Sequence, residues 1–431
     1  NCQVKYGARL INSYMGDNST VSCCEILNNL IFPAHEQHHN NSFLCSAMTL
    51  GQSNIAAGAT IGSNHNSRTN DGELMAGRGF WPGLCTSLKH NSRFASFTLL
   101  SKAAYPAELD VRLPFSLVSN DEAHNRLLVM PGYWFLYNMY ALARNAWKFH
   151  DRDRRVHKEQ HIEFDYLAPD TVEEMFAGLE LLERWVGRAS LRQTGEQSCD
   201  DAAARAEGRR LLAADSAEVD TLEVLGEQVE NTRRKTVILK ARQAWGEYRK
   251  MIVYYGVKTV MAWLEADPSR TFEATVRRLA APRVARWVNM GGQLVTEADL
   301  DALIGRMPGL GDWNQIHAEY DRLWDRYGED KTRHALASLL DIEAMAAGDL
   351  SAARWRVLLD RAVAIQNEIA DRTYQSRAKD YQSHFRTMHF TTPEEMKAVV
   401  GTVDDNSFVK QVRREAEAFA ARAAALKSAV S

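Results

Sequence analysis

Apolar side chains recur at intervals of six residues in the first part of the chain. The clearest positions are Phe43, Thr49, Ile55 and Ile61. Each is followed directly by an aliphatic or small residue: Leu44, Leu50, Ala56 and Gly62. A period of six matches neither an α-helix nor simple strand alternation. It fits a triangular coil, in which each short strand directs one side chain inward before a corner, and so predicts a left-handed parallel β-helix of the hexapeptide-repeat kind.

The corners of such a coil require residues that tolerate a positive φ, chiefly glycine and asparagine. Gly58, Gly62 and Asn64 fall at the expected corners, and weaker echoes of the period occur around residues 15–27 and 88–100. In a chain with 45% hydrophobic residues, a few apolar positions also fall into register by chance. Interruptions near 28–42 and 66–87 predict loop insertions, where solenoids usually carry function.

Composition changes near residue 150. The first 150 residues carry 20 charged side chains, whereas the remainder carry 87 and are rich in the helix formers Ala, Glu, Arg and Leu. We therefore expect a β-helix over 1–125, a connecting segment over 126–168 and an all-helical domain over 169–431. Asp170 with Glu173 resembles an N-cap box at the start of the first long helix. The chain begins within the repetitive pattern, which predicts an N-terminally truncated β-helix.

The bulk charge argues against polyanionic partners. Lysine and arginine number 52 against 55 acidic residues, a net charge of -3, so neither nucleic acid nor an anionic membrane is expected as partner. The most apolar stretch, 127–149, is interrupted by Pro131, Asn138 and Arg144, which argues against a membrane-spanning helix. Six cysteines without a CxxC pair are typical of reduced thiols and predict a cytoplasmic protein.

Four longer runs of sequence resemble a known family. They are IGSNHNSRTNDGE at 61–73, GRGFWPGLC at 77–85, LKHNS at 88–92 and PFSLVSND at 114–121. They resemble an uncharacterised bacterial domain-of-unknown-function family that joins a left-handed β-helix to a helical C-terminal part. The resemblance covers nearly the whole chain and implies further coils before Asn1. It implies no activity, although some members are labelled as similar to sugar-phosphate nucleotidyltransferases, a label that reflects the β-helix.

Hexapeptide-repeat β-helices commonly form trimeric acyltransferases, in which a histidine deprotonates a sugar hydroxyl that attacks an acyl-CoA thioester. The sequence predicts His65 as this base, with Asp71 and Glu73 as the other catalytic residues. The predicted substrate-binding residues are Asn64, Asn66, Arg68, Arg78, Lys89, His90, Asn91, Asn120 and Asp121. These polar residues have simpler alternatives: they could satisfy an irregular corner, form solvated surface or, for Asn120 and Asp121, cap the next helix.

Other chemistries find less support. His35, His38 and His39 cluster with Glu36, but their spacing matches no standard ligand pattern, so no metal is predicted. No GxxxxGK[ST] run occurs, and Gly77–Arg78–Gly79 lacks the strand and helix context of a dinucleotide site.

The preferred prediction is transfer of an acyl group from acyl-CoA to a sugar or nucleotide-sugar by a homotrimer, with acyl-CoA as co-substrate and no tightly bound cofactor. One alternative is a non-catalytic carbohydrate-phosphate binder or assembly scaffold. Another is the C-terminal part of a sugar-phosphate nucleotidyltransferase-like protein. Whether the protein is an enzyme stays open at this point.

Overall fold

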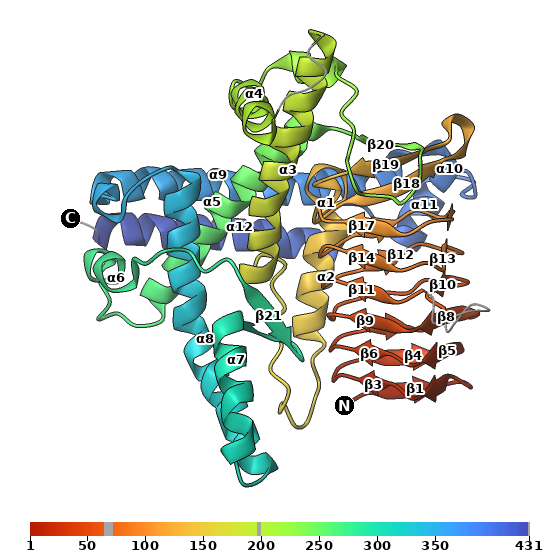
Figure 1. The fold of residues 1–431 in the computed structure, drawn as a ribbon, viewed down its shortest axis with the longest axis horizontal. Helices are drawn as coiled ribbons and strands as arrows, with labels where there is room; N and C mark the ends of the chain where they lie inside the picture. Colours follow the sequence, from red (N-terminus) through yellow and green to blue (C-terminus); the bar gives the residue numbers. More distant parts are fainter. Residues whose placement is uncertain (64–71, 196–199, 430–431) are drawn as a thin grey trace.

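The computed structural model describes residues 1–63, 72–195 and 200–429, and it consists of a parallel β-solenoid of about 6 turns followed by a mostly helical part (Figure 1). The solenoid has three faces. Face A contains β1 (Gln3–Lys5), β4 (Thr20–Ser22), β7 (Glu36–Gln37), β12 (Trp81–Pro82), β15 (Leu99–Leu100) and β18 (Leu117–Asp121). Face B contains β2 (Arg9–Ile11), β5 (Cys24–Leu27), β8 (Ser42–Cys45), β10 (Thr60–Ile61), β13 (Ser87–Leu88) and β16 (Ala104–Tyr105). Face C contains β3 (Tyr14–Met15), β6 (Leu30–Ile31), β9 (Ala47–Thr49), β11 (Leu74–Ala76), β14 (Ser92–Phe94) and β17 (Leu109–Val111). The predicted parallel β-solenoid and helical C-terminal part are therefore confirmed.

Residues paired between neighbouring coils lie 16 to 18 positions apart in the sequence. One coil is longer: Ala47 pairs with Leu74, and Thr60 with Ser87, at a separation of 27. The additional residues therefore lie between Ile61 and Leu74. Positions 64–71, within this interval, are outside the described residues.

Most side chains that the sixfold spacing directs inward are buried; Phe43 is not, because it faces outward and Leu44 takes the inward position. Thr49, Ile55 and Ile61 have no exposed surface, and Leu88, Phe94 and Leu100 of a later turn are also buried. The spacing slips in the early coils. Ile26 is buried in place of Leu27, because Leu10 and Ile26 pair across a coil of 16 residues and not 18.

The predicted loop at 28–42 is wrong. This segment contains β6 and β7, which pair in parallel with the coils on either side. Its asparagines mark corners: Asn28 and Asn41 have φ values of 57° and 58°. The described part of the second predicted loop, 72–87, likewise contains the coil strands β11 and β12. Polar composition in these segments therefore reflects tight corners and buried hydrogen bonds.

The open end of the last coil is covered by two further strands and by a segment that precedes the second of them. β19 (Arg126–Met130) pairs antiparallel with β18, and β20 (Lys235–Ile238) then pairs in parallel with β19. Beside it, residues 229–231 pair with the last strand of face C through the Asp110 N to Val229 O bond of 2.8 Å and the Asn231 N to Glu108 O bond of 3.0 Å. The region after 169 is thus not purely helical, because it supplies strands that cover the end of the solenoid.

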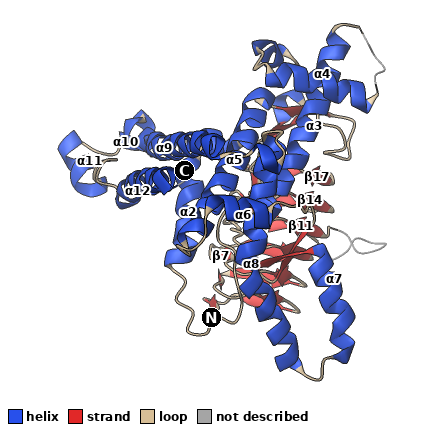
Figure 2. Ribbon diagram, turned by 90° about the vertical axis from the view of Figure 1, so that its left-hand side faces the viewer, coloured by secondary structure: helices blue, strands red, loops and turns tan. Residues whose placement is uncertain are grey.

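The helical part begins with α1 and α2 in the segment predicted as a connector. Its helices are α1 (Tyr133–Tyr137), α2 (Met139–Asp151), α3 (Pro169–Gln193), α4 (Asp201–Ala213), α5 (Ala241–Glu265), α6 (Phe272–Leu279), α7 (Glu297–Arg306), α8 (Trp313–Ile342), α9 (Ala352–Gln382), α10 (His384–Thr387), α11 (Pro393–Val400) and α12 (Ser407–Ala429). Short 3-10 turns occupy Glu122–His124, Ala217–Thr221, Met307–Gly309 and Ala347–Asp349, and a hairpin joins β21 (Trp287–Met290) to β22 (Gln293–Thr296). Both views show α7 and α8 projecting as an arm (Figures 1 and 2). No helix in the described ranges has the length and apolar character needed to cross a bilayer.

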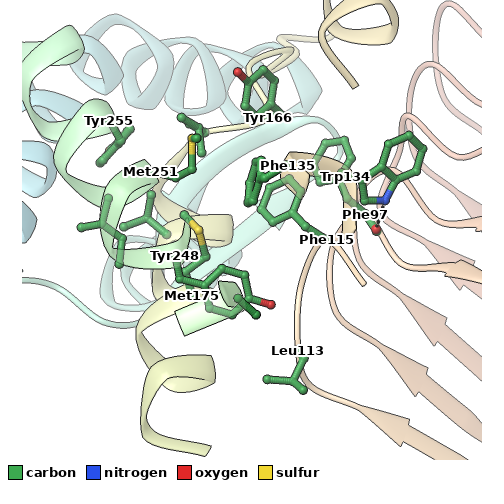
Figure 3. Packing of buried hydrophobic residues seen from close by; sticks show 14 of the residues in the cluster. Phe97, Leu113, Phe115, Trp134, Phe135, Tyr166, Met175, Tyr248, Met251 and Tyr255 are labelled. Atoms are coloured by element: carbon green, nitrogen blue, oxygen red, sulfur yellow. Dashed lines mark hydrogen bonds between the residues drawn. The ribbon is translucent and has the colours of Figure 1, made fainter. Parts of the chain in front are cut away.

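The helical part packs against the corner between faces C and A, which we call the docking corner (residues 16–17, 33–34, 51–52, 78–79, 96–97 and 114–115). Phe97 and Phe115 stack there with ring centroids 4.9 Å apart, and Phe115 contacts Phe135 at 4.4 Å (Figure 3). Tyr248 of α5 donates a hydrogen bond to the carbonyl of Pro114. One hydrophobic cluster runs from the interior of the solenoid through this corner into the helices, so burial of aromatic surface joins the two parts.

Candidate functional site

A groove with a volume of about 1280 Å³ lies along the solenoid at the corner between faces B and C, which we call the groove corner. Every coil contributes equivalent residues to it. The lining residues are Asn12, Asn28, Asn29, Leu30, Ser46, Ala47, Met48, Glu73, Leu74, Met75, Asn91, Ser92, Arg93, Glu108, Leu109, Asp110, Gln228, Val229, Glu230 and Asn231. Six coils separated by about 4.8 Å give a groove about 24 Å long.

The floor of the groove is built by strand geometry. In the three-residue strands of face C, the first and third side chains are buried in the solenoid and the middle side chain faces outward. These outward positions are paired in register from coil to coil. In chain order they are Leu30, Met48, Met75, Arg93 and Asp110. The floor is therefore apolar over three coils and charged over the last two.

The polar rim of the groove is formed by the corner residues themselves. The Oδ1 of Asn91 accepts a hydrogen bond of 2.8 Å from the backbone N–H of Glu73, which ties two neighbouring coils together. The side chain of Glu73 is exposed beside it. Deeper residues form hydrogen bonds with the backbone. The buried Asn29 donates to the carbonyl of Leu44 and accepts from the N–H of Ala47. The exposed carboxylate of Glu73 thus faces the groove, whereas Asn29 holds the corner.

The closed end of the groove carries several compensating charges. Arg93 donates two hydrogen bonds of 2.8 Å to Asp110, which raise the pKa of Arg93, and Arg112 donates to the same carboxylate at 2.9 Å. Residues 228–231 form the wall at this end of the groove. There Glu230 pairs with Arg234, and both side chains are nearly fully buried. The lining as a whole contains four carboxylates and one guanidinium. Because Arg93, Arg112 and Arg234 are already engaged by Asp110 and Glu230, this surface favours uncharged, hydroxyl-bearing ligands over polyanions.

The structure brings some of the predicted site residues together. Glu73 and Asn91 line the groove, and Lys89 and His90 belong to the same corner turn as Asn91. The catalytic candidates His65 and Asp71, with the binding candidates Asn64, Asn66 and Arg68, lie outside the described residues. Of the described residues on either side, the N–H of Ser63 bonds to the carbonyl of Gly72 at 3.3 Å, at the groove corner.

Arg78 lies away from the groove, at the docking corner. Its guanidinium is buried and donates to both carboxylate oxygens of Asp170 at 2.7 and 2.8 Å. It also donates to Gln52 Oε1 and to the carbonyl of Asp165. These contacts fill its donors and join the solenoid to α3. The expected cap at Asp170 is also wrong: the N-cap is Ala168, so the Asp170 carboxylate in the first turn is available to Arg78.

Asn120 and Asp121 lie at the end of β18, on the last coil. Arg234 donates to Asn120 Oδ1 at 2.5 Å, which ties the solenoid to the segment before β20. Asp121 caps the short turn Glu122–His124, the alternative considered for this residue, and its side-chain hydrogen bond with His124 lowers the pKa of Asp121. Neither residue lines the groove.

The predicted histidine cluster is divided between the interior and the surface. His35 is fully buried, with Nδ1 2.8 Å from Ser53 Oγ and Nε2 3.2 Å from Gln37 Oε1. Burial lowers its pKa to about 4. Among the described residues, no group of three or more His, Cys, Asp or Glu side chains is arranged to hold a metal ion.

Sequence reasoning missed the floor residues Leu30, Met48 and Met75 and the wall at 228–231. The floor has a sequence signal only after the coils are aligned, since its members are separated by 18 and then 27 positions. The wall has no local signal, because it comes from a segment more than 100 residues after the coil that it contacts.

Comparisons with known proteins identify a relative but no activity. No family model and no solved structure matches the chain. A protein of Treponema pallidum (strain Nichols), described as uncharacterized, is 43% identical over 399 residues, which cover 92% of this chain and 54% of that protein. The chain therefore spans about half the length of the curated relative that it matches. The resemblance to a domain-of-unknown-function family stays a prediction.

Proposed function

We propose that this protein binds a carbohydrate in the groove along face C. The observation that supports this most directly is the lining: amide, hydroxyl and carboxylate side chains repeat from coil to coil along about 24 Å. A sugar hydroxyl both donates and accepts, so it pairs well with such groups. Because Arg93 and Arg112 are engaged by Asp110 and the carboxylate of Glu73 is exposed in the lining, a neutral sugar fits better than the phosphorylated ligand first expected for a binding scaffold.

Calorimetric titration with a library of neutral and phosphorylated oligosaccharides tests this proposal. We expect a neutral sugar to bind, and Glu73→Gln combined with Asn91→Ala to weaken that binding about tenfold, the usual effect of losing one or two hydrogen bonds. Thr60→Ala is the control, since Thr60 is exposed on face B and does not line the groove. The proposal is wrong if no sugar binds, or if the double variant binds every sugar as tightly as the native protein.

Acyl transfer is the second candidate, and it is supported by the position of the two described residues that flank His65 in the sequence. Ser63 and Gly72, which flank residues 64–71, meet at the groove corner beside Glu73. In this reaction a sugar hydroxyl attacks the thioester of acyl-CoA, its proton passes to His65, and the CoA thiol leaves. Release of free thiol from acetyl-CoA in the presence of the sugar measures turnover. His65→Ala should lower it about 100-fold; equal thiol release by both proteins would remove His65 from the reaction.

Finer features of the architecture belong to the same proposal. We infer a left-handed solenoid of the hexapeptide-repeat class, supported by paired residues 16 to 18 apart, close to three hexads per coil. We also infer a homotrimer, as in transferases built on this repeat, and a cytoplasmic location. Light scattering coupled to gel filtration measures the subunit number directly.

A further inference from the structure

The floor of the groove has an apolar half exposed to solvent. Leu30 and Met75 are 40% and 46% exposed, and Met48 lies between them in the register of face C. Tyr14 of the first coil pairs with Leu30, extends the column beyond the groove lining and is 50% exposed. A continuous apolar strip on an open face marks a surface that something covers.

The other half of the floor is ionic. The next two positions of the same column are Arg93 and Asp110, joined by two hydrogen bonds of 2.8 Å. Beyond them, the wall formed by residues 228–231 closes the groove. A wholly polar ligand would leave Leu30, Met48 and Met75 in water. A wholly apolar one would remove the charges of Arg93 and Asp110 from water without adding hydrogen bonds to them.

We propose that the ligand of this groove is amphipathic, with a sugar head beside Arg93 and Asp110 and one alkyl chain lying along Met75, Met48 and Leu30 towards Tyr14. This proposal rests on the proposed carbohydrate site and names the class of molecule bound there. From Met75 to Tyr14 the column spans three coil separations, about 14 Å, which sets the length of chain that the floor covers.

The width of the apolar strip favours a single chain over a protein partner. The strip is one side chain wide in each coil, because the other two residues of each face-C strand are buried in the solenoid. The polar corner residues Asn28 and Ser46 border it in two successive coils. Three or four apolar side chains provide far less than the roughly 800 Å² per partner of a stable protein interface. The unbranched, flexible side chains of Met48 and Met75 instead adapt to a methylene chain, and Leu30 adds a further apolar contact.

Alkyl maltosides of increasing chain length, titrated below their critical micelle concentrations, provide the test. Maltose supplies a neutral head, and the octyl, decyl and dodecyl derivatives add methylene groups in pairs. Each methylene buried on the floor should tighten binding about fourfold. The gain should stop when the chain is longer than the apolar column, so tetradecyl maltoside should bind little more tightly than the longest chain that fits.

Met75→Glu and Thr60→Glu form the matched pair of variants for this titration. Both place a carboxylate on an outward-facing strand position, the first on the floor and the second on face B. Met75→Glu should weaken dodecyl maltoside binding tenfold or more, whereas Thr60→Glu should leave it unchanged. Both variants should unfold at the same temperature as the native protein. If Met75→Glu is unstable, Met75→Ala with its smaller loss of affinity makes the same comparison.

The outcomes separate this inference from the carbohydrate proposal. If a sugar from the library binds but added methylene groups give no gain, the alkyl chain is wrong and the carbohydrate site stands. If no sugar binds yet affinity rises with chain length and falls in Met75→Glu, the chain site stands and the sugar head is wrong. An oligomer that Met75→Glu dissociates would overturn the inference, because a second copy would then cover the floor.

Discussion

Two corners of the same solenoid differ in burial: the docking corner is covered by the helical part, and the groove corner is exposed to solvent. At the docking corner, every coil meets the helical part through buried contacts, including the stacked rings of Phe97 and Phe115 and the pair formed by Arg78 and Asp170. At the groove corner, equivalent turns of the same coils leave Asn91 and Glu73 exposed. Because the backbone repeats, side chains at equivalent positions of successive coils lie at the same corner and share the same surroundings. We therefore expect stability to depend mainly on the docking corner, and the proposed ligand binding on the groove corner.

The comparison is tested most severely by removing one arginine from each corner. Arg78→Met leaves the half-buried carboxylate of Asp170 without its partner, and we expect a loss of about 3 kcal/mol in the free energy of unfolding. Arg93→Met breaks an exposed pair with Asp110 and should cost less than about 1 kcal/mol. Urea denaturation measures both. Equal losses would mean that the two corners contribute alike to stability.

Acid should destabilise the interior next to the docking corner through His35. Burial lowers the pKa of this histidine to about 4 in the folded protein, so below about pH 6.5 the unfolded chain takes up a proton that the folded chain does not. Stability should fall by up to about 3 kcal/mol between pH 6.5 and 4.

His35→Gln removes this proton uptake. The variant should be less stable than the native protein at pH 7, because the hydrogen bonds to Ser53 and Gln37 are disturbed. Its unfolding free energy should then change less between pH 6.5 and 4. An identical pH dependence in the two proteins would contradict the assignment to His35.

The opposite pH dependence is expected from Glu174 at the interface itself. Its carboxylate accepts a hydrogen bond of 2.9 Å from the N–H of Ser96. Burial, followed by the nearby charge of Asp170, raises the pKa of Glu174 to about 8. The folded state thus holds this proton more tightly than the unfolded chain, and stability is fully present below about pH 4.5 and lost as pH rises towards 8.

Glu174→Gln should remove this loss. Because the side chain is only partly buried, we expect the variant to gain about 1–2 kcal/mol over the native protein between pH 5 and 8. Thermal unfolding across that range measures the difference. Glu180→Gln, on the exposed side of the same helix, is the control and should not reproduce the gain.

The sequence predicted what depends on short-range pattern. The positions of Thr49, Ile55 and Ile61 and the corner at Gly58 identify the solenoid, because each coil repeats the same local requirement. Arg78 could not be placed in this way. Its glycine neighbours suggested an exposed binding loop, but those glycines allow close approach: a Cβ at Gly77 would lie 2.6 Å from the N of Ser96. The partner that buries Arg78 is 92 residues away in the sequence.

The groove is the intermediate case. Glu73 and Asn91 were identified because polar residues are dense near the corner. Met75 was not singled out from the sequence, since only the coil register shows that it faces outward.

The strand that closes the solenoid has a consequence for how the protein is made. Neighbouring coils pair residues that are mostly 16 to 18 positions apart, so each coil is completed soon after it leaves the ribosome. Arg126 and Lys235, in contrast, are 109 positions apart, and Leu109 and Glu230 are 121 apart. During synthesis β17 and β19 therefore have unpaired backbone groups, exposed to pairing with another chain, until residues 229–238 emerge. The risk of pairing with another chain therefore exists only during synthesis, and it ends when residue 238 is in place.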